Sequence, residues 1–423
     1  MNVLVVGSGG REHAIVWKLK QSPRVAKVYC APGNAGISVD AECVQIKADD
    51  IYGLAQFAQT NAVGLTVVGS ELPLVKGIVD LFEERGLTIF GPSRAAAQVE
   101  GSKMFLKHFL KRHTIPTANY ETFNQSEIEK AKRHVMNSLP PYVIKTDGLA
   151  AGKGVAICQT KDEALTTVSE YFQDKVFGDA GNNIVIEEFM EGEEASVFAM
   201  CDGSDYVLLS PAQDHKRIGD GDTGKNTGGM GAYAPAPVVT KDILGRVERD
   251  IIKPTLEGMK AEGHPYKGCL YVGLMMTAAG PKVVEFNCRL GDPETQAVMP
   301  LIDSDVFELF HSCATGTVGT YSLTMKRSSA VCIVIASNGY PDEYATGKTI
   351  DGLEHVAKDV VVFHAGSKIK NGKIVTAGGR VLGVTALGDG LQSTIACAYA
   401  AVKSIKFDGM YYRTDIGKKG LSL

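Results

Sequence analysis

The stretch Val3-Leu4-Val5-Val6-Gly7-Ser8-Gly9-Gly10-Arg11-Glu12 joins an apolar, β-branched run to a helical pattern through three glycines. Short apolar runs and amphipathic stretches continue to alternate along the chain as far as residue 90. The runs are Val25–Cys30, Leu65–Val68 and Leu87–Phe90, and the helical patterns between them are Glu12–Lys20 and Leu74–Arg85. This alternation predicts a doubly wound parallel sheet, which Gly91-Pro92-Ser93 closes.

The glycines of this first turn also indicate a place where a ligand could bind. Free amides at a helix start attract an anion, and Gly9 and Gly10 have no side chain to block its approach. A dinucleotide is disfavoured, because Glu12 stands where the third glycine of that fingerprint belongs and no acidic residue follows the next strand at Ala31-Pro32-Gly33-Asn34. We predict a phosphate-bearing small molecule here, with a purely structural tight turn as the alternative.

The chain is too long, at 423 residues, for a single hydrophobic core. After the doubly wound sheet, a compact α+β pattern suits a small mobile lid, and a mixed region with a long polar loop follows it. Short β-runs then dominate up to a final helix at Leu391–Ile405. The predicted domains are residues 1–101, residues 102–121 together with 190–326, residues 122–189, and residues 327–423.

Composition and charge exclude several classes of protein. The formal net charge is -4, and the basic clusters are short, so no nucleic-acid partner is expected. The chain shows neither a signal peptide nor an apolar stretch long enough to span a bilayer, so we expect no membrane partner. The nine cysteines are scattered without any C-x-x-C spacing, which argues against disulfides and zinc and favours a reducing, cytoplasmic location.

The segment Val143-Ile144-Lys145-Thr146-Asp147-Gly148-Leu149-Ala150-Ala151-Gly152-Lys153-Gly154 predicts a strand that ends in a lysine, followed by a loop of small residues. Backbone amides in such a loop can surround phosphate oxygens, and the side chains of Lys145 and Lys153 can neutralise their charge. It is not a Walker loop, because no Ser or Thr follows Lys153 and the next element is a strand. A hairpin with solvent-facing lysines is the alternative.

Two further strand ends carry polar groups. Ile184–Met190 predicts a buried strand whose last residues could pair with an adenine edge, and Glu194 could hold ribose hydroxyls; a charged loop beside an edge strand is the alternative. On the strand Val283–Asn287, the period of two places Glu285, Asn287 and Arg289 on one face. Carboxylate and amide oxygens suit magnesium, and Arg289 could bind a carboxylate or a phosphoryl group. A charge ladder on a surface strand is the alternative, but it leaves Asn287 unexplained.

A long loop from Asp214 to Tyr233 is dense in glycine and polar side chains, which favours substrate binding. His215 lies in this loop, but a lone loop histidine more often serves as a hydrogen-bonding residue, so we assign it no catalytic role.

Taken in order, these pieces resemble the phosphoribosylamine–glycine ligases, or glycinamide ribonucleotide synthetases, of the ATP-grasp superfamily. The resemblance covers nearly the whole chain. The matching strings are Gly9–His13, Ala31–Gly36, Asp147–Gly154, Gln213–Arg217, Asn226–Tyr233 and Arg289–Glu294. Thr146 stands where the family commonly has Ala, and Lys225 where it often has Pro. The resemblance implies an α/β and α+β multidomain fold: an N-terminal doubly wound sheet, an ATP-grasp core of two α+β modules and a small β-rich C-terminal domain.

The family's activity is ATP-dependent ligation of glycine to 5-phosphoribosylamine, through a glycyl phosphate, in de novo purine synthesis. The resemblance implies ATP as co-substrate and Mg²⁺ or Mn²⁺ as the metal. It also implies a monomer that contacts the enzyme supplying phosphoribosylamine only transiently. The implied site residues are Lys103, Lys145, Gly152 and Lys153 for ATP phosphates; Glu187, Glu188, Phe189 and Met190 for adenine; Glu194 for ribose; Glu285 and Asn287 for metal; Arg289 for the transition state; and Asp214, Lys216 and Asp292, with Gly9 and Gly10, for the amine substrate.

Two rival functions remain open on the sequence. One is another ATP-grasp enzyme, such as a carboxylase acting on a related purine intermediate. The other is a nucleotide-binding regulatory protein without chemistry, which the presence of Glu285, Asn287 and Arg289 disfavours.

Overall fold

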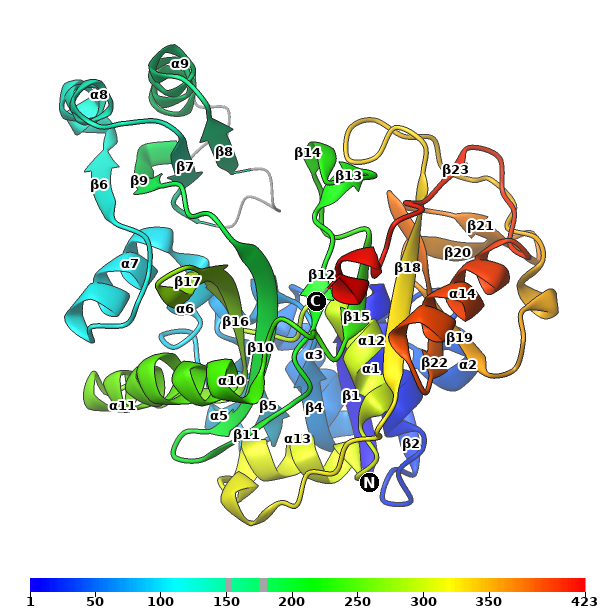
Figure 1. The fold of residues 1–423 in the computed structure, drawn as a ribbon. Coiled ribbons are helices and arrows are strands. Elements are labelled where there is room, and N and C mark those ends of the chain that lie inside the picture. Colours follow the sequence, from blue (N-terminus) through cyan, green and yellow to red (C-terminus); the bar gives the residue numbers. More distant parts are fainter. Residues whose placement is uncertain (149–153, 175–180, 423) are drawn as a thin grey trace.

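The structure, a computed structural model, describes residues 1–148, 154–174 and 181–422. Within these ranges four sheets of four to six strands form the framework, together with two short hairpins. A small sheet with two helices extends away from the body of the molecule, and the C-terminal sheet lies on the other side of the central strands (Figure 1). The predicted fold class is confirmed: a parallel N-terminal sheet, mixed α/β units after it and an antiparallel C-terminal sheet.

The N-terminal sheet is parallel, with the order β3-β2-β1-β4-β5. Its strands are β1 (Asn2–Gly7), β2 (Lys27–Pro32), β3 (Glu42–Cys43), β4 (Val63–Val68) and β5 (Ile89–Phe90). Its helices are α1 (Gly10–Leu19), α2 (Ile37–Asp40), α3 (Ile51–Thr60), α4 (Glu71–Lys76), α5 (Ile78–Glu84) and α6 (Gln98–Gly101). The strand order reverses between β1 and β4, and in such sheets ligands bind beyond the carboxyl ends of the strands at this point.

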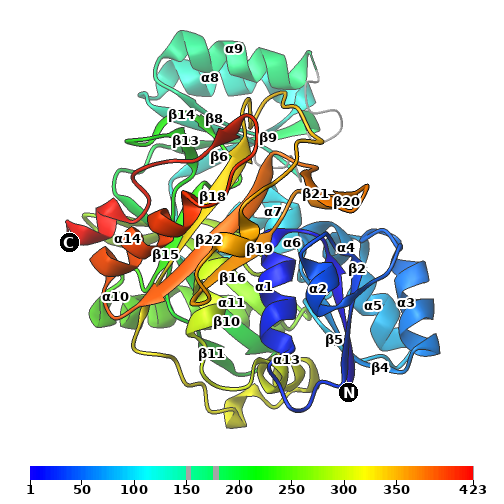
Figure 2. The same cartoon turned by 90° about the vertical axis from the view of Figure 1, so that its right-hand side faces the viewer.

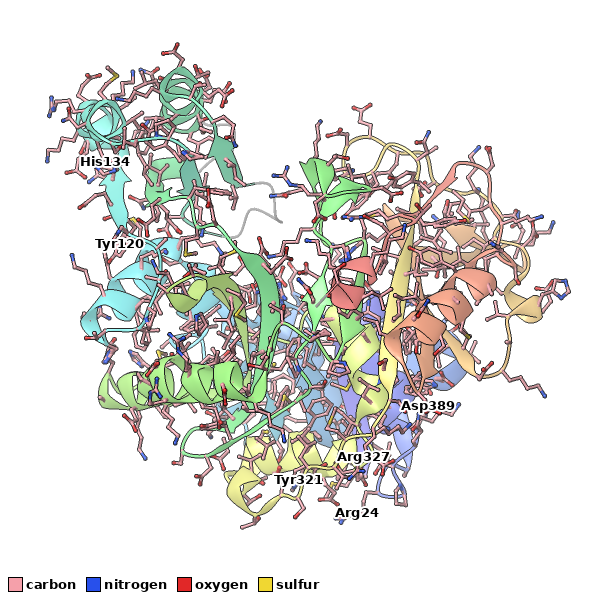
Figure 3. The ribbon with its side chains drawn as sticks, viewed as in Figure 1. Arg24, Tyr120, His134, Tyr321, Arg327 and Asp389 are labelled. Carbon is pink, nitrogen blue, oxygen red and sulfur yellow. The ribbon has the colours of Figure 1, made fainter. Side chains whose placement is uncertain are left out.

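The small sheet is antiparallel and has its own apolar core. It has the order β6-β9-β7-β8, and α8 and α9 cover it. The elements are β6 (Tyr120–Asn124), α8 (Ile128–Asn137), β7 (Tyr142–Thr146), β8 (Val155–Cys158), α9 (Lys161–Phe172) and β9 (Asn183–Glu188). Tyr120, labelled in Figure 3 at the base of this unit, donates a hydrogen bond from its hydroxyl to the carbonyl of Lys107 in the preceding helix α7 (Lys103–Arg112), at 2.8 Å.

The central sheet, of order β11-β10-β16-β17, is antiparallel and supports the candidate site. Its strands are β10 (Glu193–Asp202), β11 (Tyr206–Leu208), β16 (Lys267–Thr277) and β17 (Gly280–Asn287). One apolar cluster joins it to the N-terminal sheet, since Leu4 and Val6 belong to the same core as Val197 and Val272. The helices near it are α10 (Lys241–Val247), a π-helical turn (Glu248–Ile252), α11 (Lys253–Ala261), α12 (Glu294–Val298) and α13 (Val306–Thr315).

The C-terminal sheet takes strands from two distant parts of the chain, as the view in Figure 2 shows. Two short strands from the middle of the chain pair onto it, so the sheet spans the predicted division at residue 326. The elements are β12 (Gln213–Asp214), β15 (Gly231–Ala234), β18 (Ser329–Ser337), β19 (Val360–His364), β22 (Arg380–Gly388), α14 (Leu391–Val402) and β23 (Met410–Tyr411), with the hairpins β13 (Arg217–Gly219) to β14 (Thr223–Asn226) and β20 (Ser367–Lys370) to β21 (Lys373–Thr376).

Two sequence-based expectations were wrong in detail. The pattern Leu74–Arg85 is not one helix, because Gly77, at φ +90°, separates α4 from α5. The stretch from Asp214 to Tyr233 is not an irregular loop, because it holds the β13–β14 hairpin and part of β15. Gly221, at φ +66°, lies in the turn between β13 and β14. The apolar partners of β15 lie about a hundred residues away in β18, where local patterns do not reveal them. Among the described residues, no helix is long and apolar enough to cross a membrane.

The break at Gly77 gives a test of the fold. Gly77→Ala forces a side chain into a left-handed conformation, so we expect the free energy of unfolding to fall by about 1–2 kcal/mol in urea denaturation. Gly245→Ala is the matched control, because Gly245 lies in α10 with open space around its missing β-carbon and should gain about 0.5–1 kcal/mol. Equal effects at the two positions would contradict this account of the break.

Candidate active site

A cavity of about 460 Å³ lies where the small sheet, the central sheet, the N-terminal unit and the C-terminal sheet meet. Thirteen of the predicted site residues line it. They are Lys103, Lys145, Glu187, Glu188, Phe189, Met190, Glu194, Asp214, Lys216, Glu285, Asn287, Arg289 and Asp292. Residues assigned to different ligands from separate stretches of sequence therefore come together in one place. Gly152 and Lys153 lie outside the described residues.

Two buried lysines pair with one carboxylate of the small sheet. Glu187 forms ion pairs with two lysines: the Nζ of Lys145 lies 2.9 Å from its Oε1, and the Nζ of Lys107 lies 3.0 Å from its Oε2. The side chains of Glu187 and Lys107 are each only 2% exposed. Burial raises the pKa of Glu187, but the two lysine charges outweigh it and leave that pKa lowered. Burial lowers the pKa of Lys107 to about 8, so both groups stay charged at neutral pH. This pairing fixes Lys145 at the cavity wall, where Val284 also accepts from its Nζ at 3.2 Å.

An apolar slot lies beside these charges, between the small and the central sheets. Val143 and Ile157 are cross-strand partners in β7 and β8, and Met275 and Val284 face them from β16 and β17. The slot is lined by Val143, Val155, Ile157, Phe189, Met190, Met275 and Val284. A flat aromatic base could stack there, beside the strand end Glu187–Met190.

A line of alternating charges crosses the cavity from the central sheet. Lys216 approaches Glu194 at 2.6 Å and Glu285 at 3.8 Å, and Lys103 approaches the second oxygen of Glu285 at 3.7 Å. Burial raises the pKa of Glu285, but the charges of Lys216 and Lys103 and those of Lys145 and Arg289 outweigh burial and lower it to about 2. Glu285 is therefore an ionised carboxylate at neutral pH.

The carboxylates outnumber the cations in this cavity. Nine carboxylates and six lysines or arginines line its described part. The excess of carboxylates affects Asp214. Burial and the negative charges of Glu294 and Glu194 raise the pKa of Asp214 to about 8, while Lys216 opposes the shift. Such a site favours ligands that bring positive charge with them, such as a divalent metal or an ammonium group.

The residues present fit a hard divalent metal ion. Glu285 and Asn287 both lie at the end of β17 and both line the cavity. An ionised carboxylate and an amide oxygen are the ligands that Mg²⁺ accepts, and Mg²⁺ usually takes its remaining ligands from water and substrate phosphates. No cluster of three or more His, Cys, Asp or Glu side chains suited to a metal occurs in residues 1–148, 154–174 and 181–422.

Arg289 reaches the cavity just beyond β17 and is held by two carboxylates that sequence reasoning missed. Glu100 accepts from its Nη2 at 3.0 Å, and Glu71 accepts from its Nε at 3.3 Å. The second oxygen of Glu100 accepts from the backbone amide of Cys288 at 2.7 Å. Glu100 thus fixes both the backbone and the guanidinium at this position.

Asp292 is bound to the C-terminal sheet through Arg380. The Nη1 of Arg380 lies 3.2 Å from Oδ1 of Asp292 and donates to the Asp292 carbonyl at 2.8 Å and to the Gly228 carbonyl at 2.5 Å. No hydrogen bond recorded within the described ranges uses the Nε or Nη2 of Arg380. A β-carbon on Gly228 would lie 3.2 Å from that Nη2, so the missing side chain keeps this edge of the guanidinium open.

Gly9 and Gly10 are not among the residues that line the cavity, although a β-carbon on Gly9 would lie 3.3 Å from Asp292. The amide of Gly9 donates to Glu12 at 2.6 Å, so a side chain of the same helix already occupies one of the amides proposed for an anion. The assignment of these glycines to a substrate phosphate stays a prediction. His215 is buried, and burial lowers its pKa to about 4.

Several residues that line the cavity, or that support its lining, had no signal in the local sequence. Glu71, Glu100 and Lys107 lie in helical stretches, where a charged residue ordinarily indicates a solvent-facing side, and Arg380 opens a C-terminal strand. The one hint was Gly228-Gly229, since paired glycines suggest that another group approaches closely.

The paired lysines give a prediction about stability. Lys107→Met leaves the buried Glu187 with one partner, so we expect the free energy of unfolding to fall by about 3 kcal/mol in urea denaturation. The double variant K107M/E187Q should lose less than the two single variants added together, because the unpaired charge is gone. Lys130→Met, which breaks an exposed pair, is the control and should change little. If the loss in the double variant equalled the sum of the two single losses, Lys107 and Glu187 would not be energetically coupled.

Comparisons with known families agree with this geometry. Three models of phosphoribosylglycinamide synthetase match the chain: the N domain over residues 1–100, the ATP-grasp domain over 101–295 and the C domain over 330–419. Phosphoribosylamine–glycine ligases from Pseudomonas aeruginosa and Yersinia pestis are 50% and 51% identical, and each alignment covers 100% of this chain and 99% of the relative.

Solved structures extend the likeness to three dimensions. The crystal structure of phosphoribosylamine–glycine ligase from Thermotoga maritima has a TM-score of 0.86 and 33% identity, covering 98% of this chain and 100% of that one. A biotin carboxylase from Campylobacter jejuni, at a TM-score of 0.74 and 14% identity over 100% of this chain and 94% of that one, shares the fold alone. All three matched regions contribute residues to the cavity. The chain belongs to the phosphoribosylamine–glycine ligase family of ATP-grasp enzymes.

Proposed function

We propose that this protein joins glycine to 5-phosphoribosylamine at the expense of ATP, giving glycinamide ribonucleotide, ADP and phosphate in purine biosynthesis. The observation that carries this proposal is the end of β17, where Glu285, Asn287 and Arg289 face Lys103 and Lys145 across one cavity. Anionic groups of two substrates could meet there between cationic side chains. The full-length relatives at about half identity bear the name of this activity.

The reaction follows from where the charges lie. A carboxylate oxygen of glycine attacks the γ-phosphorus of ATP, the bond to the β–γ bridging oxygen breaks, and ADP leaves. Lys145, Lys103 and Arg289 stabilise the phosphoryl charge as it moves, so catalysis consists chiefly of positioning and electrostatics. The amine nitrogen of phosphoribosylamine then attacks the acyl carbon of the glycyl phosphate, inorganic phosphate leaves, and the nitrogen gives up a proton as the amide forms.

Glu285 and Asn287 would hold Mg²⁺ or Mn²⁺, which would supply positive charge to neutralise part of the charge of the ATP phosphates. The apolar slot with Glu187–Met190 would hold adenine, and Glu194 the ribose. No hydrogen bond recorded within the described ranges uses the backbone of Phe189 or Met190, so their amide and carbonyl groups are open to an adenine edge. Gly152 and Lys153 are assigned to the ATP phosphates on the sequence alone.

The amine substrate would bind on the opposite side, against Asp214, Lys216 and Asp292. The open edge of Arg380 suits the phosphate of phosphoribosylamine, because a guanidinium fork binds phosphate oxygens in pairs. Gly9 and Gly10, beside Asp292, would approach the same phosphate or the ribose next to it. The small unit, residues 122–189, would act as a lid that excludes water from the acyl phosphate, and its separate sheet and core support this role.

The remaining proposals concern the cellular location, the oligomeric state and the partners of the protein. We infer a cytoplasmic enzyme, since all nine cysteines carry free thiols and most of them are buried. We infer a monomer that acts on small-molecule substrates. The described residues that line the cavity all come from one chain, so the proposed site needs no residue from a second chain. A transient contact with the enzyme that supplies the labile amine is proposed on the chemistry of that amine.

An ADP-release assay tests the proposed function. With freshly made phosphoribosylamine, ADP should form only when glycine, ATP and Mg²⁺ are all present. ADP release that depends on bicarbonate instead of glycine would favour the rival carboxylase and overturn the ligase assignment.

Replacing the metal ligand tests the site. Glu285→Gln keeps the shape but removes the charge, so we expect kcat to fall by about 1,000-fold or more while circular dichroism and melting stay close to wild type. The exposed Glu121→Gln is the control and should keep full activity. Unchanged turnover in E285Q would rule out the metal assignment.

Glu100 tests the positioning of Arg289. Glu100→Gln replaces an acceptor of two hydrogen bonds by an amide that can accept only at one atom, so the guanidinium loses its fixed direction. We expect kcat to fall by about 100-fold with little change in the KM for ATP. A rise in the KM for ATP at constant kcat would instead assign Glu100 to nucleotide binding.

A further inference from the structure

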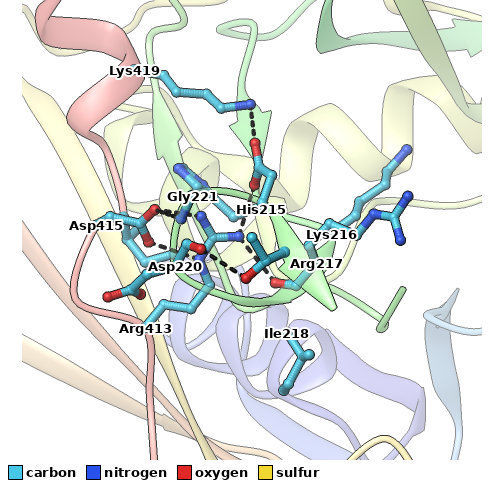
Figure 4. Close-up of polar contacts among 12 residues, drawn as sticks. His215, Lys216, Arg217, Ile218, Asp220, Gly221, Arg413, Asp415 and Lys419 are labelled. Atoms are coloured by element: carbon cyan, nitrogen blue, oxygen red, sulfur yellow. Dashed lines mark hydrogen bonds and ion pairs between the residues drawn. The ribbon is translucent and has the colours of Figure 1, made fainter. Parts of the chain in front are cut away.

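Arg413 is the largest fully buried side chain in the described part of the molecule, although it lies ten residues from the end of the chain. Its Nε and Nη2 donate to the two carboxylate oxygens of Asp415, each at 2.7 Å. Its Nη1 donates to Asp222 at 2.8 Å and to the carbonyl of Arg217 at 3.0 Å. Figure 4 shows this guanidinium in the middle of the polar network.

The network joins the C-terminal segment to the β13–β14 hairpin at several points. Asp415 accepts from the amide of Gly221 at 2.8 Å, and Asp220 accepts from the amide of Thr414 at 2.8 Å. Lys419 pairs with Asp222 at 2.5 Å. The three turn residues Asp220, Gly221 and Asp222 therefore all have partners in residues 411–419.

The two ends of this hairpin reach the cavity. Lys216 precedes β13, and Asn226, Thr227 and Gly228 end or follow β14; all four line the cavity. The amide of Thr227 donates to the carbonyl of Lys216 at 2.7 Å, which closes the base of the hairpin. A shift of the hairpin would therefore move the group that contacts Glu194 and Glu285.

Charge pairing and burial fix the C-terminal segment to the β13–β14 hairpin. The Arg413 side chain is 0% exposed, and its charge is acceptable there only because Asp222 and Asp415 neutralise it. Burial raises the pKa of Asp222, but Lys419 and Arg413 outweigh it and lower that pKa. The paired charges stay ionised at neutral pH, so the contacts persist under working conditions.

We propose that Arg413 is a positioning residue for the amine-substrate side of the active site. It acts through the β13–β14 hairpin, holding Lys216 and Thr227 where the substrate binds, and it touches no substrate itself. The catalytic centre is thus completed by the C-terminal segment, residues 411–419. This inference rests on the proposed function for its kinetic part.

Steady-state kinetics of Arg413→Met and Arg413→Lys test the proposal in the full chain. Arg413→Met should raise the KM for phosphoribosylamine by about tenfold or more and leave the KM for ATP within about twofold. Arg413→Lys keeps the positive charge but lacks the planar guanidinium. Its KM for phosphoribosylamine should therefore lie between those of the wild type and Arg413→Met. Lys348→Met is the control, because it breaks an exposed ion pair with Asp408 in the same C-terminal unit and should leave both KM values unchanged.

Hydrogen–deuterium exchange supplies a readout that does not need activity. Exchange in residues 216–228 should rise in Arg413→Met, while β18 stays protected. If Arg413→Met does not fold, Asp222→Asn, whose side chain is partly exposed, should show the same pattern more weakly.

Unchanged KM values in the folded variant, or an equal loss of kcat with every KM unchanged, would overturn the proposal. Unchanged exchange in residues 216–228 would do the same. A wild-type protein without glycine-dependent ADP release would instead refute the proposed function, and the exchange data would still decide whether Arg413 orders the hairpin.

Discussion

Charge pairing among partly buried side chains is the constraint on which the site depends. Glu194, Lys216, Glu285 and Lys103 follow one another across the cavity, each within 3.8 Å of the next, although they come from four separate stretches of chain. A charge taken out of water is stable only beside an opposite charge or a set of hydrogen bonds. These pairings connect separate stretches of the chain across the cavity, and bound ligands would replace or extend them.

The framework divides the proposed chemistry between two sides. The nucleotide side uses the small sheet and the central sheet, where Lys145 is fixed by Glu187 and the apolar slot lies alongside. The amine side uses the N-terminal unit, the C-terminal sheet and the hairpin that Arg413 holds. Arg289, between them, is oriented by carboxylates from the N-terminal part of the chain, Glu71 and Glu100. A glycyl phosphate formed on one side would therefore lie directly before the amine on the other.

The sequence predicted the strands and the groups at their ends, because each is a local signal. A lysine at the end of β7 and the alternation of Glu285 with Asn287 on β17 can be read without knowing the neighbours. The supporting residues could not be predicted in this way. Lys107 and Glu100 lie in helical stretches that look amphipathic or ordinary, and their roles exist only because strands from elsewhere bring Glu187 and Arg289 beside them. Arg413 is a more extreme case, since two of its partners, Arg217 and Asp222, lie about two hundred residues earlier.

Oxygen transfer from glycine to phosphate tests the central claim most directly. In a single turnover with glycine carrying ¹⁸O in both carboxylate positions, attack on the γ-phosphorus places one labelled oxygen in the P–O–C bridge. Mass spectrometry should then find one ¹⁸O atom in the released phosphate and one in the amide of the product. Phosphate without label, formed together with the amide, would show that the carboxylate is not phosphorylated and would contradict the mechanism assigned to this cavity.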